Sequence, residues 1–289
     1  MSHHSHNIAL VLSSGAARGV AHIAVIEELL KSGHKITSIA GSSMGAVVGG
    51  MHAAGTLEAY ADWLKDLDYW DVFNLLDFTI STKGLIKGEK VFKKVAPYLP
   101  KINIEDLPIP FVAVAADIIK KKAVVFDKGN LTDAIRASVS IPTLLLPVKS
   151  NNSLIVDGGV VNPIPVDLVK RYPGDKLVVV DVNANIPFNK PKMPKKEETF
   201  INELRRKYFK WQKSDKDKEL NLGIFAMMNE SFDLTQETLS KLLLQEHKPD
   251  LTIQVSRKAC GTMDFHKTPE LLVLGREAYH KAITNSNQF

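Results

Sequence analysis

The most informative local pattern in the chain is Gly41-Ser42-Ser43-Met44-Gly45. It follows the apolar run 36–40 and opens a run of small and apolar residues, 46–51. The pattern predicts a strand, a tight turn and a helix, with Ser43 at the turn. Gly-x-Ser-x-Gly is the spacing of a nucleophile elbow, where a strained turn leaves room only for glycine on either side of the serine. Taken alone, the pattern also fits a glycine- and serine-rich connection without chemistry.

Size and composition fit one large α/β domain or two small ones. The chain has 289 residues, of which 45% are hydrophobic and 24% are charged, as in ordinary globular proteins. The single cysteine, Cys260, rules out an internal disulfide and a cysteine-based metal cluster, and it fits a reducing compartment. No apolar run reaches the ~18 residues of a membrane span, and the start of the chain has no signal-peptide core. We therefore predict a cytoplasmic protein without a metal site.

The positive charge is concentrated in one segment. The net charge is +5, and residues 190–218 contain eleven Lys or Arg and five acids, a net of +6. Aromatic and apolar side chains are interleaved with these charges, so peripheral contact with an anionic membrane is one interpretation. A nucleic-acid interface is disfavoured. A solvated face of an insertion explains the charges equally well, and the segment could act as a lid, a membrane anchor or a dimer contact.

A second strand-turn-helix pattern begins the chain. Residues 7–14 predict a buried strand, Ser13 to Gly19 a turn, and the residues up to Lys31 a helix. Two such turns at neighbouring strand ends would form a cleft. A dinucleotide loop would need Gly-x-Gly-x-x-Gly and a later acid, which are missing here. The turn fits an oxyanion hole for Ser43 better, because small residues let backbone N–H groups approach an anion.

Periodicity gives the rest of the chain a coarse outline. Residues 56–76 carry large apolar groups at helical spacing, which fits core packing or the lining of an acyl-chain pocket. The other expected elements are strands at 109–117, 123–126, 144–148, 154–156, 177–182 and 251–255, and helices at 89–99, 131–139, 166–171 and 269–283. Asp157, before Gly158 and Gly159, would be a carboxylate on a tight, exposed loop near Ser43.

Four motifs together resemble the bacterial single-domain members of the patatin-like phospholipase family. They are Ser13–His22, Gly41–Gly45, Ala134–Ser138 with Ile141-Pro142, and Asp157-Gly158-Gly159, in the family's order and spacing. The resemblance implies a three-layer α/β/α sandwich with a mostly parallel central sheet. We expect one domain over 1–289, with core motifs in 7–183, a basic and mostly helical insertion at about 184–247, and a C-terminal strand and helix in 248–289.

The resemblance also implies a serine lipid acyl hydrolase that needs no cofactor. Ser43 would be the nucleophile and Asp157 its base, in a catalytic dyad. The N–H groups of Gly15 and Ala16, with that of Met44, would form the oxyanion hole. The residues expected to support the motifs are Arg18, Gly19, Gly41, Gly45, Gly158 and Gly159. Ser13, Ser14 and Ala16 replace glycines of the family's first motif, so the oxyanion loop is where strain is expected.

The expected reaction is cleavage of fatty-acyl esters, of the phospholipase A, lysophospholipase or carboxylesterase type. Burial would raise the pKa of Asp157 enough for it to act as a base. One alternative is a weakly active lipid-binding or regulatory protein on the same scaffold. Another is an α/β-hydrolase triad completed by His247 or His266, although in that fold the elbow follows several strands. We expect His22 and His52 to be packed or half-exposed.

Overall fold

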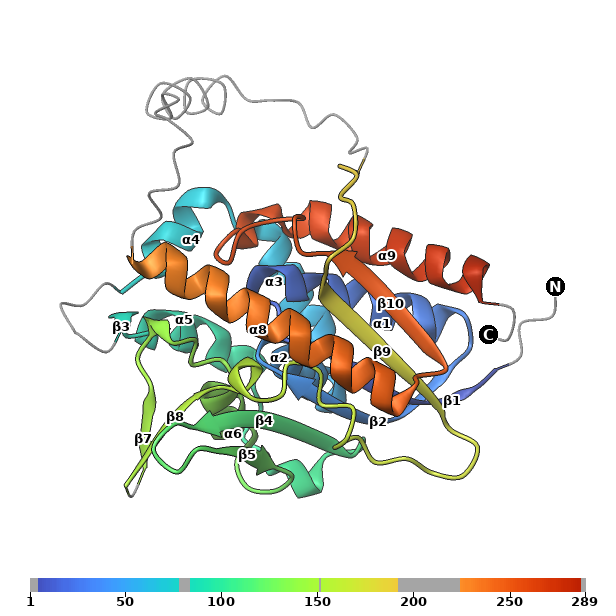
Figure 1. The fold of residues 1–289 in the computed structure, drawn as a ribbon, viewed down its shortest axis with the longest axis horizontal. Helices are drawn as coiled ribbons and strands as arrows, with labels where there is room; N and C mark the ends of the chain where they lie inside the picture. The colour runs from blue at the N-terminus through green and yellow to red at the C-terminus, as the bar shows by residue number, and fades with distance from the viewer. Residues whose placement is uncertain (1–4, 78–83, 151, 192–223, 287–289) are drawn as a thin grey trace.

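Two parallel β-α units at the start of the chain form the centre of the fold (Figure 1). β1 (Asn7–Leu12) leads through a 3₁₀ helix (Ala16–Val20) into α1 (Ala21–Lys31), and β2 (Lys35–Ser42) leads into α2 (Met44–Ala53). The two strands pair in parallel, so the turns at residues 13–19 and at Ser43 lie at the same edge of the sheet, as predicted. The computed structural model describes residues 5–77, 84–150, 152–191 and 224–286.

The described residues contain an eight-stranded mixed sheet in the order β10-β9-β1-β2-β4-β8-β7, with β5 paired to β4. The five strands from β10 to β4 are parallel, whereas β5, β8 and β7 are joined by antiparallel pairings. The remaining strands are β3 (Gly84–Ile86), β4 (Phe111–Asp117), β5 (Lys122–Phe126), β6 (Thr143–Leu145), β7 (Val148–Ser150), β8 (Ser153–Asp157), β9 (Lys176–Ala184) and β10 (Leu251–Ser256). The remaining α-helices are α3 (Leu57–Asp66), α4 (Tyr69–Leu75), α5 (Glu89–Val95), α6 (Leu131–Ser138), α8 (Ile224–His247) and α9 (Thr268–Asn285).

Alternating side chains of β1 pack into two separate cores. Ile8, Leu10 and Leu12 belong to the large core with α1, α2 and α9, whereas Ala9 and Val11 belong to a smaller core on the other face. This follows from the two-residue period of a strand. Leu243 and Leu244 of α8 pack against the smaller core, and α8 crosses the sheet on the face opposite α1 and α2 (Figure 1). The fold is thus an α/β fold with helices on both sides of a mostly parallel sheet.

Three expected elements differ from those observed. The helix expected at 166–171 is a series of turns, because Val166 N–H bonds to the Ile164 carbonyl and Leu168 N–H to the Pro165 carbonyl, and no helical ladder begins. The strand expected at 144–148 is split, since β6 pairs with β3 while β7 forms a hairpin with β8. The helical stripe at 56–76 is two helices, broken where Asp68 caps the start of α4.

The expected insertion at 184–247 is described only at its two ends. β9 runs to Ala184, and the last 24 residues form the helix α8. Most of the basic segment 190–218 lies outside the described residues, and its expected contact with an anionic membrane stays a prediction.

Candidate active site

Ser43 lies at a strained turn between β2 and α2. Its φ of 54° is in the left-handed region that a non-glycine residue rarely adopts. The backbone is packed closely on both sides of it. A Cβ on Gly41 would lie 2.4 Å from the carbonyl oxygen of Gly45, and a Cβ on Gly45 would lie 2.2 Å from that of Leu12. Glycine is required at both positions, which is why the local sequence pattern predicted the elbow.

Ser138, at the end of α6, holds the elbow in place. The backbone N–H of Ser43 donates to Ser138 Oγ over 2.9 Å, and Ser138 Oγ donates to the carbonyl of Val114 in β4 over 2.6 Å. Ser138 is completely buried. Its motif, Ala134–Ser138, was part of the resemblance, but the sequence assigned this hydroxyl no role.

Asp157 meets Ser43 across the end of the sheet. The Oγ of Ser43 donates to Oδ2 of Asp157 over 2.5 Å, and the N–H of Gly159 donates to Oδ1 over 2.8 Å. The backbone N–H of Asp157 donates to the Ser140 carbonyl over 2.9 Å. Both carboxylate oxygens and the backbone are therefore fixed, with one oxygen turned toward the serine hydroxyl.

The expectation that Asp157 lies on an exposed loop is wrong. Asp157 is only 1% exposed to solvent, and Ser43 is 3% exposed. Burial raises the pKa of Asp157 to about 7, against the lowering effect of the bonds from Ser43 and Gly159. A carboxylate with this pKa is a far better proton acceptor at neutral pH than an ordinary aspartate, whose pKa is about 3.9.

The loop at residues 13–19 lies beside the elbow. Ala16 has a φ of 47°, so this alanine is held in the left-handed region that favours glycine. Within the described residues, the backbone N–H groups of Gly15, Ala16 and Met44 donate no hydrogen bond. Arg18 is buried, and its guanidinium donates hydrogen bonds to the carbonyls of Gly15 and Arg257. These bonds hold the 13–19 loop in place.

An apolar cavity is lined in part by Ser43. Ala16 and Met44 also line it, and almost all the other lining side chains are apolar. The lining residues from the stripe at 56–76 are Tyr60, Trp63, Leu64, Leu67, Val72, Leu75 and Leu76. The stripe thus serves both the core and the cavity. Trp70 and Phe73, which were expected on the same face, are more than one-third exposed and do not line the cavity.

No described histidine forms a hydrogen bond with the side chain of Ser43 or Asp157. The described partners of these two side chains are each other and the Gly159 N–H, with no histidine among them. His22 is buried, and its Nε2 lies 2.9 Å from the carbonyl of Ser13. Burial lowers its pKa to about 4, so it stays neutral and buttresses the loop. His266 makes an edge contact with Tyr69.

Among the described residues, no three His, Cys, Asp or Glu side chains gather in a way that could bind a metal ion. No helix in the same part of the chain has the length and apolar character needed to cross a bilayer. The thiol of Cys260 is free and partly buried, and burial raises its pKa to about 11.

Comparison with known proteins identifies the family. The family model for patatin-like phospholipase matches residues 10–170, which include Ser43 and Asp157. The chain belongs to the patatin-like phospholipase family. An uncharacterised NTE family protein of Mycobacterium tuberculosis is 32% identical over 96% of this chain and 92% of its own length. The neuropathy target esterase sws of Drosophila melanogaster is 27% identical over 62% of this chain, but over only 13% of its own.

A mouse patatin-like phospholipase domain-containing protein 6 is 28% identical over 62% of this chain and 14% of its own. A crystal structure of VipD from Legionella pneumophila aligns with 98% of this chain and 67% of its own, with 12% identity and a TM-score of 0.47. Membership of the patatin-like phospholipase family implies a hydrolase of the esterase or lipase type that acts on lipid substrates.

Proposed function

We propose that this chain is a serine lipid acyl hydrolase, which cleaves fatty-acyl esters through an acyl-enzyme on Ser43 with Asp157 as the base. The observation that carries the proposal is the 2.5 Å hydrogen bond between Ser43 Oγ and Asp157 Oδ2, with Ser43 in the lining of an apolar cavity. A serine hydroxyl is a weak nucleophile until a base within hydrogen-bond reach takes its proton. The buried carboxylate of Asp157 has the pKa and the position for that task.

In the first half of the reaction, Ser43 Oγ attacks the ester carbonyl carbon while its proton passes to Asp157. The tetrahedral intermediate then collapses. Asp157 gives the proton to the oxygen of the leaving group, which departs as the alcohol. In the second half, Asp157 takes a proton from water as the water attacks the acyl-enzyme. The fatty acid is released, and the proton returns to Ser43 Oγ.

The negative charge that develops on the substrate oxygen needs donors that are already in place. The N–H groups of Gly15, Ala16 and Met44 are free of other partners in the described residues, and Ala16 and Met44 line the cavity beside Ser43. We assign the oxyanion hole to these three groups. Loss of one such donor typically costs about 10²–10³ in rate.

Two variants and one probe test the proposal. Ser43→Ala should abolish hydrolysis of a p-nitrophenyl ester and labelling by a fluorophosphonate, and Asp157→Asn should lower kcat by at least about 10². The fold of each variant is checked by circular dichroism. Undiminished turnover in Ser43→Ala would discard the serine as nucleophile. An unlabelled wild-type chain that binds fatty acid would favour a lipid-binding protein instead.

The apolar lining supports a long acyl chain as the bound group, but several ester classes carry one. A panel of lysophospholipids, diacyl phospholipids, triglycerides and short esters, assayed with Ser43→Ala as the blank, assigns the head group.

A further inference from the structure

α8 packs on the sheet through two different kinds of side chain. Near its C-terminal end, Leu243 and Leu244 pack against the small core below the sheet. In its middle, the buried side chains are polar, and Gln236 is only 6% exposed. A helix gains little by burying a glutamine in place of a leucine unless the amide has contacts of its own. What surrounds Gln236 is therefore informative.

Gln236 is packed into the space between the two loops of the candidate active site. A Cβ added to Gly159 would lie 2.1 Å from Gln236 Nε2, 3.0 Å from Asp157 Oδ1 and 3.1 Å from Ser14 Oγ. The glutamine amide, the Asp157 carboxylate and the Ser14 hydroxyl thus converge on one point beside the Gly159 Cα. The absence of a side chain at position 159 makes room for this approach.

Asn183 connects Gln236 to the 13–19 loop. The Nδ2 group of Asn183 donates to the carbonyl of Ser14 over 2.9 Å and to Oε1 of Gln236 over 3.4 Å. The N–H of Ser14 donates to the carbonyl of Pro163, which follows the Asp157 turn. Gln236 therefore adds a contact from α8 to two loops that already meet at Ser14.

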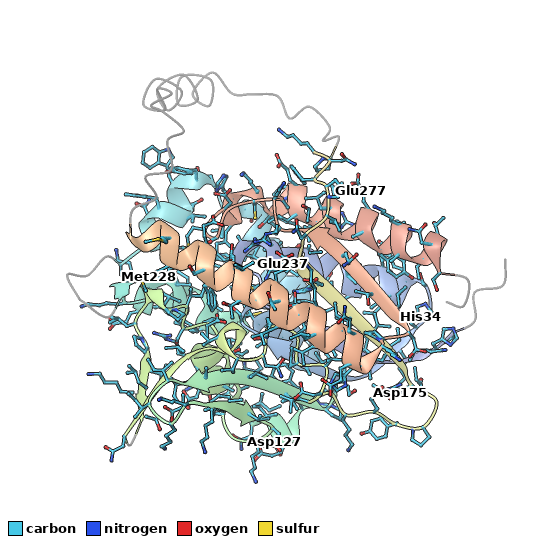
Figure 2. All side chains as sticks on the ribbon, in the orientation of Figure 1. His34, Asp127, Asp175, Met228, Glu237 and Glu277 are labelled. Atoms are coloured by element: carbon cyan, nitrogen blue, oxygen red, sulfur yellow. The ribbon has the colours of Figure 1, made fainter. Side chains whose placement is uncertain are left out.

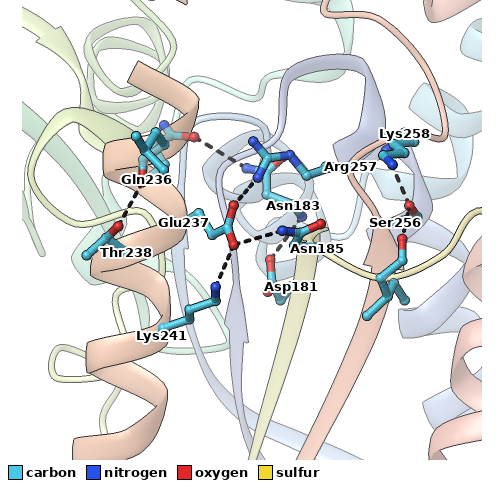
Figure 3. Close-up of polar contacts among 12 residues, drawn as sticks. Asp181, Asn183, Asn185, Gln236, Glu237, Thr238, Lys241, Ser256, Arg257 and Lys258 are labelled. Carbon is cyan, nitrogen blue, oxygen red and sulfur yellow. Dashed lines mark hydrogen bonds and ion pairs between the residues drawn. The ribbon is translucent and has the colours of Figure 1, made fainter. Parts of the chain in front are cut away.

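The next residue of α8, Glu237, fixes the position of Gln236. Its carboxylate accepts hydrogen bonds from Asn185, Lys241 and Arg257 (Figure 3). These partners lower the pKa of Glu237 to about 2, with the Lys241 bond as the largest cause, so the group stays ionised. Glu237 lies near the middle of α8, and Met228 lies near the N-terminal end of the same helix (Figure 2). The carbonyl of Arg257 also accepts a hydrogen bond from Arg18. The ion pair between Glu237 and Arg257 therefore connects α8 to the 13–19 loop through Arg18 as well as through Gln236.

We propose that Gln236 is a positioning residue for the Ser43–Asp157 pair. By filling the space beside Gly159, its side chain holds the Asp157 turn against the Ser14–Gly15 loop and keeps water from the outer side of the Asp157 carboxylate. This inference rests on the proposed function for its effect on turnover, but its effect on the Asp157 carboxyl does not depend on turnover. The ion pair between Glu237 and Arg257 keeps this part of α8, and with it Gln236, in place beside Gly159.

The electrostatic surroundings make the effect measurable. Asp157 forms no ion pair with another described residue, so a change at position 236 acts on a carboxyl whose other contacts are neutral. The elements packed around it also carry charged or titratable side chains. Among the described residues these are Asp117 on β4, Asp133 and Arg136 on α6, Lys149 on β7, His52 on α2, Arg18 on the 3₁₀ helix at 16–20, and Glu230, Asp233, Glu237, Lys241, Glu246 and His247 on α8.

Two substitutions at one position should move the Asp157 carboxyl in opposite directions. Gln236→Ala opens the site to water, which stabilises the ionised carboxyl and lowers its pKa by about one unit. Gln236→Glu brings a second carboxylate close to Asp157, which raises the pKa by about one unit. Both variants should lower kcat by about 10- to 100-fold, because the dyad loses its fixed geometry, and leave KM within about twofold. Gln245→Ala, on an exposed part of the same helix, is the matched control and should change neither quantity.

The experiment combines the pH profile of kcat/KM with a titration of the Asp157 carboxyl by ¹³C NMR, assigned with Asp157→Asn. The expected result is an acid limb and a carboxyl pKa that move down in Gln236→Ala and up in Gln236→Glu. Unchanged pKa values in both folded variants would overturn the inference, whether or not kcat falls. If the carboxyl pKa values move as expected but the wild-type chain hydrolyses no ester, the positioning role stands and the proposed function fails.

Discussion

Ser42 and Asp157 occupy consecutive positions along the same edge of β4. Ser42 pairs with Val114 at the end of β2, and Asp157 pairs with Ala115 at the end of β8. β5 pairs with residues 113–117 on the other edge, so β2 and β8 must share this one. Because β2 runs parallel to β4 and β8 runs antiparallel, the two strands approach end to end. Ser43 and Asp157, 114 residues apart in the chain, meet at the junction.

Activity should depend on the ionisation of Asp157. Burial raises its pKa to about 7, and only the ionised carboxylate can accept the serine proton. We therefore expect kcat/KM to fall about tenfold per pH unit below pH 7 and to reach a plateau above it. The profile is measured with a neutral p-nitrophenyl ester, whose own charge does not change over this range. A flat profile down to pH 5 would show that the base is a group with an ordinary pKa.

The same burial should make the folded chain less stable as pH rises. Between about pH 4 and pH 7 the folded state keeps the proton on Asp157 while the unfolded state has lost it, so the free energy of unfolding falls through this window and is level above it. Asp157→Asn removes this dependence. Its free energy of unfolding relative to wild type should increase from pH 4 to pH 7, by up to about 4 kcal/mol.

Urea unfolding at pH 5 and pH 8 measures the part of this change that lies above pH 5, about 3 kcal/mol. Gln245→Ala, at an exposed and non-titrating position of α8, serves as the control and should show the same difference from wild type at both pH values. A gain for Asp157→Asn that is equal at pH 5 and pH 8 would contradict a raised pKa.

The elbow at Ser43 could be predicted from the sequence because the residues that require it are its neighbours in the chain. Gly41 and Gly45 are needed within two residues of Ser43, and the close backbone contacts leave no other choice. The environment of Asp157 was harder to predict, because the direction of β8 is set by its hairpin with β7. An Asp-Gly-Gly sequence looks the same at an exposed turn and at a buried strand junction.

Gln236 had no sequence signal at all. In a helix with charged neighbours, a glutamine indicates a solvated face, and only the fold reveals that Gly159 and Asn183 lie against it. The helix wrongly expected at 166–171 has a similar cause. The hydroxyl of Ser38, which is distant in sequence, donates a hydrogen bond to the carbonyl of Lys170. This carbonyl therefore has its partner in another part of the fold, which the sequence of 166–171 does not reveal.

Packing at the elbow should make Gly45 intolerant of a side chain. Its Cβ would lie 2.2 Å from a backbone carbonyl oxygen of β1, which cannot move without displacing the strand. We expect Gly45→Ala to lower the free energy of unfolding by about 1–3 kcal/mol or more. Gly261→Ala, where the nearest atom is 3.5 Å from the added Cβ, should stay within about 0.5 kcal/mol of wild type. Equal stability of the two variants in urea unfolding would refute the packing argument.

Glycine at position 16 should relieve strain in the 13–19 loop. The φ of Ala16 is 47°, and the left-handed region costs an alanine about 1–2 kcal/mol. The greater freedom of glycine in the unfolded chain offsets part of this gain, so Ala16→Gly should raise the free energy of unfolding by about 0.5–1 kcal/mol. Ala278→Gly, in the middle of α9, should have the opposite sign and lower it by about 1 kcal/mol. Destabilisation of both variants would mean that the Ala16 methyl group contributes packing that outweighs the strain.

The length of the acyl chain that the cavity accepts should depend on Val47. This residue lies one helical turn after Ser43 on α2, and its side chain lines the apolar cavity. Val47→Phe adds bulk close to the serine and leaves less room beyond it. We expect kcat/KM for a p-nitrophenyl ester of a long fatty acid to fall by about tenfold or more, while the acetate ester is hydrolysed within about twofold of the wild-type rate. The short ester is the internal control for an intact Ser43–Asp157 pair. Equal losses on both esters would indicate damage to the elbow, and equal retention would mean that the acyl chain binds outside this cavity.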